Sequence, residues 1–216
     1  MIIASRFNGP PGTGNGGYSA GLFAAESVAA GGLAEVTLRR PPPLDVPLSR
    51  VGADVVDPAG TVIASVSPVE PFAPSLDPVS PAAATEASRR YAGFSDHPFP
   101  TCYVCGPEHP DGLRVFPGPL DDGRVAAPFT APGEVTPETV WAALDCPGGW
   151  SVLSPGRPFV LGRMAAIVAA PPEPGATCVV VGAMSAAEGR KARVVSALFT
   201  PAGDLLAHAR ATWIAV

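Results

Sequence analysis

The sequence of 216 residues contains almost no lysine, since Lys191 is the only one. Lysine and arginine together number 14 against 19 acidic residues, which gives a formal net charge of −5. Proteins that bind the phosphate backbone of nucleic acids present a basic face to it. The shortage of cations therefore excludes a nucleic-acid partner from our expectations.

Long apolar runs are missing as well. Stretches such as residues 178–181 and 196–199 fall far short of the roughly 20 residues that span a bilayer. The opening MIIASRFNG has no charged region followed by an apolar one, so we expect no signal peptide and no membrane partner. The expected location is cytoplasmic, where the four cysteines stay reduced rather than forming a disulfide framework.

Proline and glycine, in contrast, are abundant. The 28 prolines and 24 glycines make up about a quarter of the chain, a level at which disorder has to be considered. Because 47% of the residues are hydrophobic and only 15% are charged, the chain can nevertheless bury a large core. There is no Gly-X-Y period, which excludes collagen. We conclude that these residues separate the elements of a folded protein.

The same order of signals occurs twice along the chain. In the first half, a glycine-rich loop over residues 9–17 precedes a helical segment of small residues, and prolines follow the first strand. The expected elements here are a helix over 18–30 and strands over 34–40, 44–56 and 61–66. In the second half, Thr136 and Pro137 open a helix that is expected to end near Asp145. The expected strands there are 159–170, 178–183, 193–200 and 205–216.

This repetition predicts an α+β fold of two units, each with a central helix wrapped by a curved antiparallel sheet. The predicted units are residues 1–68 and 101–216. Residues 69–100, rich in proline, alanine and serine, are predicted to be a linker with a short helix over 82–91.

Three segments carry a resemblance to a known family: NGGYSAG at 15–21, WAALDCPGGW at 141–150 and the closing GDLLAHARATWIAV. Together with the repeated order, they resemble the double hotdog fold of acyl-CoA thioesterases of the acyl-CoA thioesterase II type. CYVCGPEHPDGL, residues 102–113, is similar to a segment that precedes the first strand in many small hotdog thioesterase-like proteins. The resemblance implies a hydrolase that acts on a small-molecule acyl thioester, with coenzyme A as part of the substrate. It is compatible with a monomer or with a homo-oligomer of double hotdogs.

Asn15, Gly16 and Gly17 are the first candidate catalytic residues, because they stand where a helix begins. Free N–H groups at a helix N-terminus can polarise a thioester carbonyl. The alternative is a plain glycine-rich turn with an N-cap. A phosphate-binding loop is excluded, since no Gly-Lys-Ser/Thr follows.

Asp145 is the candidate acidic residue, because a carboxylate in the otherwise apolar AALDC is costly unless it is paired or faces a polar cleft. An exposed aspartate at the end of the helix is the alternative. The family resemblance implies a catalytic aspartate on this second helix, together with a Thr or Ser and a Gln. The sequence contains no glutamine, so a catalytically silent protein that binds acyl thioesters or lipids stays open. A hotdog hydratase is disfavoured, because its spacing of aspartate and histidine does not occur.

Binding of an anionic coenzyme A would require cations. Arg190, Lys191 and Arg193 gather in one segment, and Arg163 lies on a neighbouring predicted strand. We expect these four residues to contact the substrate. A solvated hairpin tip is the alternative for the segment.

His97, Cys102, Cys105 and His109 have the spacing H-x4-C-x2-C-x3-H. These ligand types suit tetrahedral zinc, but the surrounding prolines also fit a rigid turn without metal. We favour the turn, so no cofactor is expected.

Overall fold

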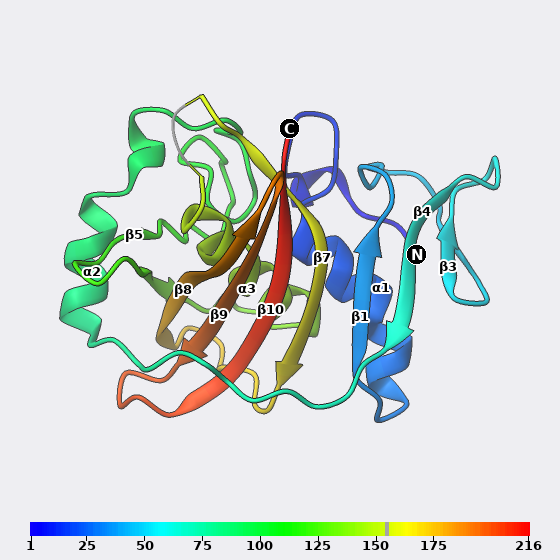
Figure 1. Cartoon of the computed structure of the whole chain (residues 1–216). Coiled ribbons are helices and arrows are strands. Elements are labelled where there is room, and N and C mark those ends of the chain that lie inside the picture. The colour runs from blue at the N-terminus through cyan, green and yellow to red at the C-terminus, as the bar shows by residue number, and fades with distance from the viewer. Residues whose placement is uncertain (154–155) are drawn as a thin grey trace.

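The computed structural model describes residues 1–153 and 156–216 (Figure 1). Its three α-helices are α1 (Gly16–Ala29), α2 (Pro81–Arg89) and α3 (Pro137–Trp150), and short 3-10 turns cover Ser5–Phe7 and Ala92–Phe94. The strands are β1 (Ala34–Leu38), β2 (Ser49–Val51), β3 (Asp54–Val56), β4 (Val62–Pro68), β5 (Gly118–Pro119), β6 (Val125–Thr130), β7 (Phe159–Val168), β8 (Thr177–Glu188), β9 (Lys191–Phe199) and β10 (Leu205–Ala215).

All of these strands form one antiparallel sheet in the order β2-β3-β4-β1-β7-β10-β9-β8-β6-β5. Strands β1 and β7 join the N-terminal and C-terminal parts of the chain, with Val36 opposite Met164. The sheet curves around α1 and α3, which pack against each other on its inner side (Figure 1). The predicted α+β class, with helices wrapped by a curved antiparallel sheet, is therefore confirmed.

Both central helices begin with a side-chain cap, of which Thr136 was predicted, and α1 starts two residues before the predicted residue 18. The side-chain oxygen of Asn15 accepts a hydrogen bond from the Tyr18 N–H at 2.9 Å. Thr136 Oγ1 accepts from the Thr139 N–H at 3.3 Å, and Pro137 occupies the first helical position. Each cap satisfies a backbone donor that the first helical turn leaves free.

Glycines allow α1 to approach α3 closely. A Cβ atom added at Gly17 would lie 2.4 Å from the Asp145 Cβ, and one added at Gly21 would lie 2.9 Å from the Trp141 Cβ. Neither distance is sterically possible, so the contact between the two helices requires glycine at both positions. This contact places the N-terminus of α1 beside the middle of α3.

The prediction that helix α3 ends near Asp145 is wrong, because the helix continues through Pro147 to Trp150. The glycines after the proline are used for packing: a Cβ at Gly148 would lie 2.6 Å from a methyl carbon of Val194, and one at Gly149 2.4 Å from the Trp213 ring. Tertiary packing against the sheet thus outweighs the low helix propensity of Pro and Gly. As a result, the whole segment is buried under β9 and β10.

The prediction of one continuous strand over residues 44–56 is also wrong. The structure has two short strands, β2 and β3, with Val51 opposite Asp54. Gly52 turns the chain between them with a φ of +59°, a conformation that glycine adopts without strain. The alternation of apolar residues did not reveal this turn.

The predicted linker over residues 69–100 begins on the outer face of the sheet, and its last residues reach the inner side, where Tyr91 packs against Trp150. Residues 69–80 cross that face near β10 (Figure 1), where the His208 ring nitrogen Nε2 lies 3.0 Å from the carbonyl oxygen of Phe72. Helix α2 follows and packs against β5, β6 and β8. Strand β6, which the sequence analysis missed, extends the sheet beneath it. The division into units 1–68 and 101–216 stays a prediction.

Within the described residues, no helix is long and apolar enough to cross a bilayer.

Candidate functional site

A cavity of about 330 Å³ lies where the N-terminus of α1, the second half of α3 and the strands β7 and β10 meet. Its volume is in the range of small-molecule sites. Most of its wall is apolar, and a few polar groups are exposed within it. The apolar side chains include Leu38, Phe99, Leu153, Val160, Leu161, Trp213 and Ile214, and the polar ones include Thr13, Asn15, Arg39, Arg40 and Asp145.

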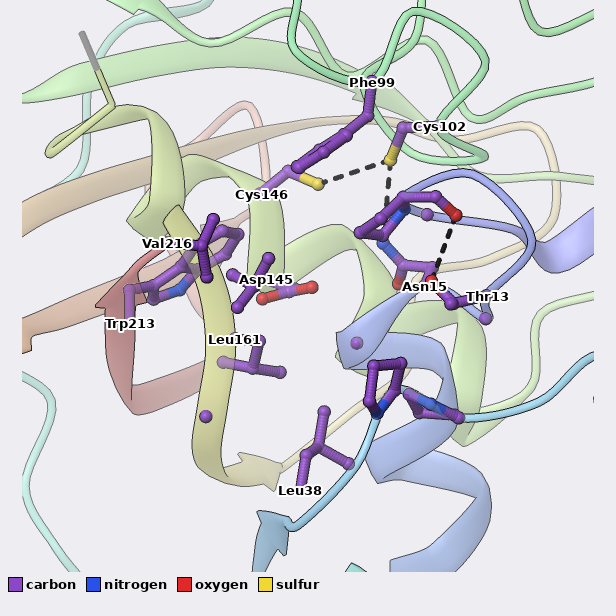
Figure 2. Close-up of a pocket in the computed structure, with 18 of the residues that line it drawn as sticks. Thr13, Asn15, Leu38, Phe99, Cys102, Asp145, Cys146, Leu161, Trp213 and Val216 are labelled. Carbon is purple, nitrogen blue, oxygen red and sulfur yellow. Dashed lines mark hydrogen bonds between the residues drawn. The ribbon is translucent and has the colours of Figure 1, made fainter. Parts of the chain in front are cut away.

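Asp145 points into this cavity from α3 (Figure 2). Its residue is 2% exposed. One carboxylate oxygen, Oδ2, accepts a hydrogen bond from the Gly17 N–H at 2.8 Å, and the other, Oδ1, has no partner among the described residues. A buried carboxylate oxygen without a partner is costly, which makes Asp145 a candidate functional residue.

Burial raises the pKa of Asp145 to about 8, although the hydrogen bond from Gly17 acts in the opposite direction. Near neutral pH, both the protonated and the ionised carboxyl group are then accessible. A group of this kind can both accept and return a proton. The alternative of an exposed aspartate at the helix end is therefore wrong.

The three residues predicted at the start of α1 have different roles in the structure. Asn15 uses its side-chain oxygen for the cap, and the Gly17 N–H is committed to Asp145. Gly16 lines the cavity, and its N–H has no acceptor within the described part of the chain. Of the three, Gly16 is the one whose amide remains available for a ligand.

Three thiols form a cluster at the other wall of the cavity. The sulfur atoms of Cys102, Cys105 and Cys146 all lie within 4.8 Å of one another, and those of Cys102 and Cys146 are 4.0 Å apart (Figure 2). Hydrogen bonds from the other two thiols lower the pKa of Cys102 well below its usual value. Burial raises the pKa of Cys105. Hydrogen bonds of the Cys146 thiol with Cys102 and Cys105 raise the pKa of Cys146.

The four residues with zinc-like spacing are not brought together. His109 lies apart from the thiols, with its ring Nε2 2.8 Å from the carbonyl oxygen of Arg6. His97 approaches only Cys105, at 3.4 Å between Nε2 and Sγ. Cys146, which the spacing pattern did not include, joins the cluster instead. Its contribution could not be read from local spacing, because it comes from α3.

The predicted substrate-binding cations do not line the cavity. Arg163 and Arg193 line a separate polar cleft with Glu35, and Arg163 forms an ion pair with Glu35 at 3.3 Å. Arg190 and Lys191 stand at the turn between β8 and β9, where Arg190 Nε donates to the Ala215 carbonyl at 3.1 Å.

Two exposed arginines that the sequence analysis missed, Arg39 and Arg40, line the cavity instead. They directly follow β1 and precede the proline stop. Two adjacent arginines directly after a strand are the signal that could have identified them, because loops that follow strands commonly carry binding residues.

Two solved structures match this chain over almost its full length. One is a protein from Novosphingobium aromaticivorans that is provisionally named a thioesterase, with 14% identity, 99% of this chain and 93% of that chain covered, and a TM-score of 0.60. The other is a conserved protein of unknown function with a hotdog fold from Alicyclobacillus acidocaldarius, with 11% identity, 99% and 91% covered, and a TM-score of 0.59. No family model matches the sequence, and neither does any curated protein. At these identities the comparison establishes the fold: the chain is a hotdog-fold protein.

Proposed function

We propose that the protein is a thioester hydrolase that acts on acyl-CoA or a similar acyl thioester. The observation that carries this proposal is the carboxylate of Asp145, which is buried in an apolar cavity with one oxygen unpartnered and which lies beside the N-terminus of α1. A helix N-terminus that stabilises negative charge and a carboxylate that moves a proton are the two functions that thioester hydrolysis requires.

In the proposed reaction, the thioester carbonyl oxygen accepts a hydrogen bond from the Gly16 N–H. Asp145 takes a proton from a water molecule, whose oxygen attacks the carbonyl carbon. The oxyanion that forms is stabilised by the positive end of the α1 dipole. When the carbon–sulfur bond breaks, Asp145 returns the proton to the leaving thiolate, and a carboxylic acid and a thiol are released. Direct attack of the Asp145 carboxylate, followed by hydrolysis of the anhydride, is the alternative route.

The proposed substrate class rests on two groups of residues that line the cavity. Leu161, Trp213 and Ile214 offer an apolar surface to an acyl chain. Arg39 and Arg40 are exposed at its edge and supply the cations that phosphate groups of coenzyme A would bind. The cations predicted from the sequence, Arg163, Arg190, Lys191 and Arg193, are not part of this proposal.

We also propose that the chain consists of two hotdog units with a single site between them. Helices α1 and α3 both have 14 residues. The ninth residue of α3 is Asp145, whereas the ninth residue of α1 is Ala24. If the units are equivalent, only one of the two helices has a carboxylate at this position, and a second copy of the site would have alanine in place of Asp145.

Hydrolysis of a panel of acyl-CoAs of increasing chain length tests the function. The purified protein is expected to release free thiol well above the uncatalysed rate for at least one member. Calorimetric titration with the same compounds measures binding and so separates a hydrolase from a protein that only binds acyl thioesters. Binding without thiol release would contradict the hydrolase and support the silent acyl-thioester-binding protein that the absence of glutamine left open.

A further inference from the structure

Three buried sulfur atoms converge at one wall of the cavity, and two of them come from a turn held against the third. Cys102 and Cys105 belong to the loop before β5, and Cys146 belongs to α3. All three cysteines are 3–4% exposed. A Cβ added at Gly106 would lie 2.4 Å from the Cys102 nitrogen, so the turn that brings the two loop sulfurs together requires glycine after the second cysteine.

We propose that Cys102, Cys105 and Cys146 bind a thiophilic divalent cation, with Zn²⁺ as the expected occupant. Zinc with bonds of about 2.3 Å to sulfur in a tetrahedron places neighbouring sulfurs about 3.8 Å apart. The Cys102 and Cys146 sulfurs are 4.0 Å apart, and no pair in the trio exceeds 4.8 Å. The Cys102–Cys146 pair needs to close by only about 0.2 Å, and a pair at the 4.8 Å limit by about 1 Å, to reach the coordination geometry.

N–H groups near the cluster can donate hydrogen bonds to sulfur atoms that a bound metal has deprotonated. Asn15 Nδ2 donates to the Cys102 sulfur at 3.7 Å. Trp150 lines the cavity together with Cys105, and its indole nitrogen is buried with no hydrogen-bond partner among the described residues. Such donors stabilise the sulfur ligands of a metal from outside the coordination shell. Three thiolates held together without a cation would repel one another strongly, and a divalent metal removes that repulsion.

His97 is placed as one of these outer donors and not as a ligand. Its Nδ1 accepts a hydrogen bond from the Phe99 N–H at 2.8 Å, so in the neutral ring the proton is on Nε2. That N–H lies 3.2 Å from the Cys105 carbonyl oxygen and 3.4 Å from its sulfur. The protein therefore supplies three ligands, and a solvent molecule completes the tetrahedron. Metal binding releases the remaining thiol protons to solvent.

Metal analysis of the full chain tests the proposal without reference to hydrolysis. The protein is purified under reducing conditions, without chelator and without a metal-affinity column. We expect about one zinc per chain. Cys146→Ser is expected to lose the metal, whereas Cys178→Ser, which replaces the buried cysteine of β8 outside the cluster, is expected to retain it. His97→Gln should weaken binding by about ten- to hundredfold, and His109→Gln should leave it unchanged.

A spectroscopic measurement on the unmodified protein covers the case in which Cys146→Ser does not fold. X-ray absorption at the zinc edge is expected to show a shell of three sulfurs at about 2.3 Å with one lighter atom. A shell of two sulfurs and two nitrogens would overturn the proposed ligand set. Metal-free protein with four free thiols would overturn the site altogether, and metal-free protein with fewer thiols would assign the cluster to disulfide chemistry instead. Neither metal result decides the hydrolase proposal, which is tested separately by thiol release from acyl-CoAs.

Discussion

At the residue scale, Asp145 combines features that do not favour stability. Its carboxylate is buried, and only one of its oxygens has a hydrogen-bond partner in the described part of the chain. Residues of this kind are retained where function requires them and are often replaced without loss of stability.

We therefore expect Asp145→Asn to be at least as stable as the wild type. The asparagine oxygen can still accept from the Gly17 N–H, and a neutral amide costs less to bury than a carboxylate. Urea denaturation of both proteins measures the difference in the free energy of unfolding. A loss of more than about 2 kcal/mol, the range typical of breaking a buried polar contact, would mean that the carboxylate is structural.

Arg39 and Arg40 give a second prediction at this scale. The double variant Arg39→Ala, Arg40→Ala is expected to raise KM for an acyl-CoA, because the phosphate groups lose two cations at the cavity edge. At about 1 kcal/mol for each exposed charge, the increase is about fivefold per arginine. The control substrate is the same acyl group on a short thiol without phosphates, for which KM should not change.

Arg163→Ala serves as the matched control protein for that experiment, because Arg163 lies in the separate polar cleft. It should behave like the wild type with both substrates. An equal rise in KM for the arginine pair and for Arg163 would indicate a general effect of charge and not a contact with phosphate.

Asp145 and the start of α1 could be proposed as candidates from the sequence because a carboxylate in an apolar helix and a glycine pair before a helix are local signals. Arg39 and Arg40 were missed because their position depends on where β1 ends relative to a cavity formed by distant strands. Cys146 was missed for the same reason: its sulfur meets Cys102 only after α3 has packed against the loop. Residues that act locally were therefore predictable, and residues that act through tertiary contact were not.

At the scale of elements, the contact between α1 and α3 holds the site together. Gly17 and Gly21 lie one helical turn apart on the face of α1 that touches α3. This spacing sets how deeply α1 approaches and hence where its N-terminus meets Asp145.

Gly21→Ala is expected to destabilise the protein by about 1–3 kcal/mol, the usual cost of overpacking. The added Cβ would lie 2.9 Å from both the Glu138 Cα and the Trp141 Cβ, which outweighs the higher helix propensity of alanine. Gly133→Ala is the matched control, because a Cβ there meets nothing within 4 Å. Thermal unfolding compares the two, and equal transition temperatures would contradict the close contact.

The elements themselves were largely predictable from patterns of capping and periodicity. Thr136 and Pro137 gave the start of α3 correctly, whereas its end was predicted too early, because Pro147 and two glycines have low helix propensity. Only the packing of those glycines against Val194 and Trp213 explains why the helix continues. The early stop assigned to α3 shows that local propensity fails where tertiary contacts are tightest.

At the scale of the whole molecule, the two predicted units share both a sheet and a helix pair. Strands β1 and β7 pair directly, and α1 packs on α3. The segment between the units also lies against β10. A repeated order of elements could be predicted from the sequence, but this shared packing depends on contacts between residues far apart in the chain.

We therefore expect the chain to unfold in one cooperative transition, because neither half buries its helix without the other. Tryptophan fluorescence reports only on the C-terminal half, where Trp141, Trp150 and Trp213 lie, whereas far-ultraviolet circular dichroism reports on the whole chain. The two denaturation curves should coincide. Separate midpoints would mean that the units fold independently.

The central claim is that the cavity between α1 and α3 hydrolyses a thioester with Asp145 as the group that moves the proton. The ratio of kcat/KM between the wild type and Asp145→Asn, measured with the best acyl-CoA of the panel, tests it most directly. Loss of a general base typically costs about 10²- to 10⁴-fold, so we predict a decrease of at least about 100-fold in a variant that remains folded. A folded Asp145→Asn variant with the activity of the wild type would contradict the claim.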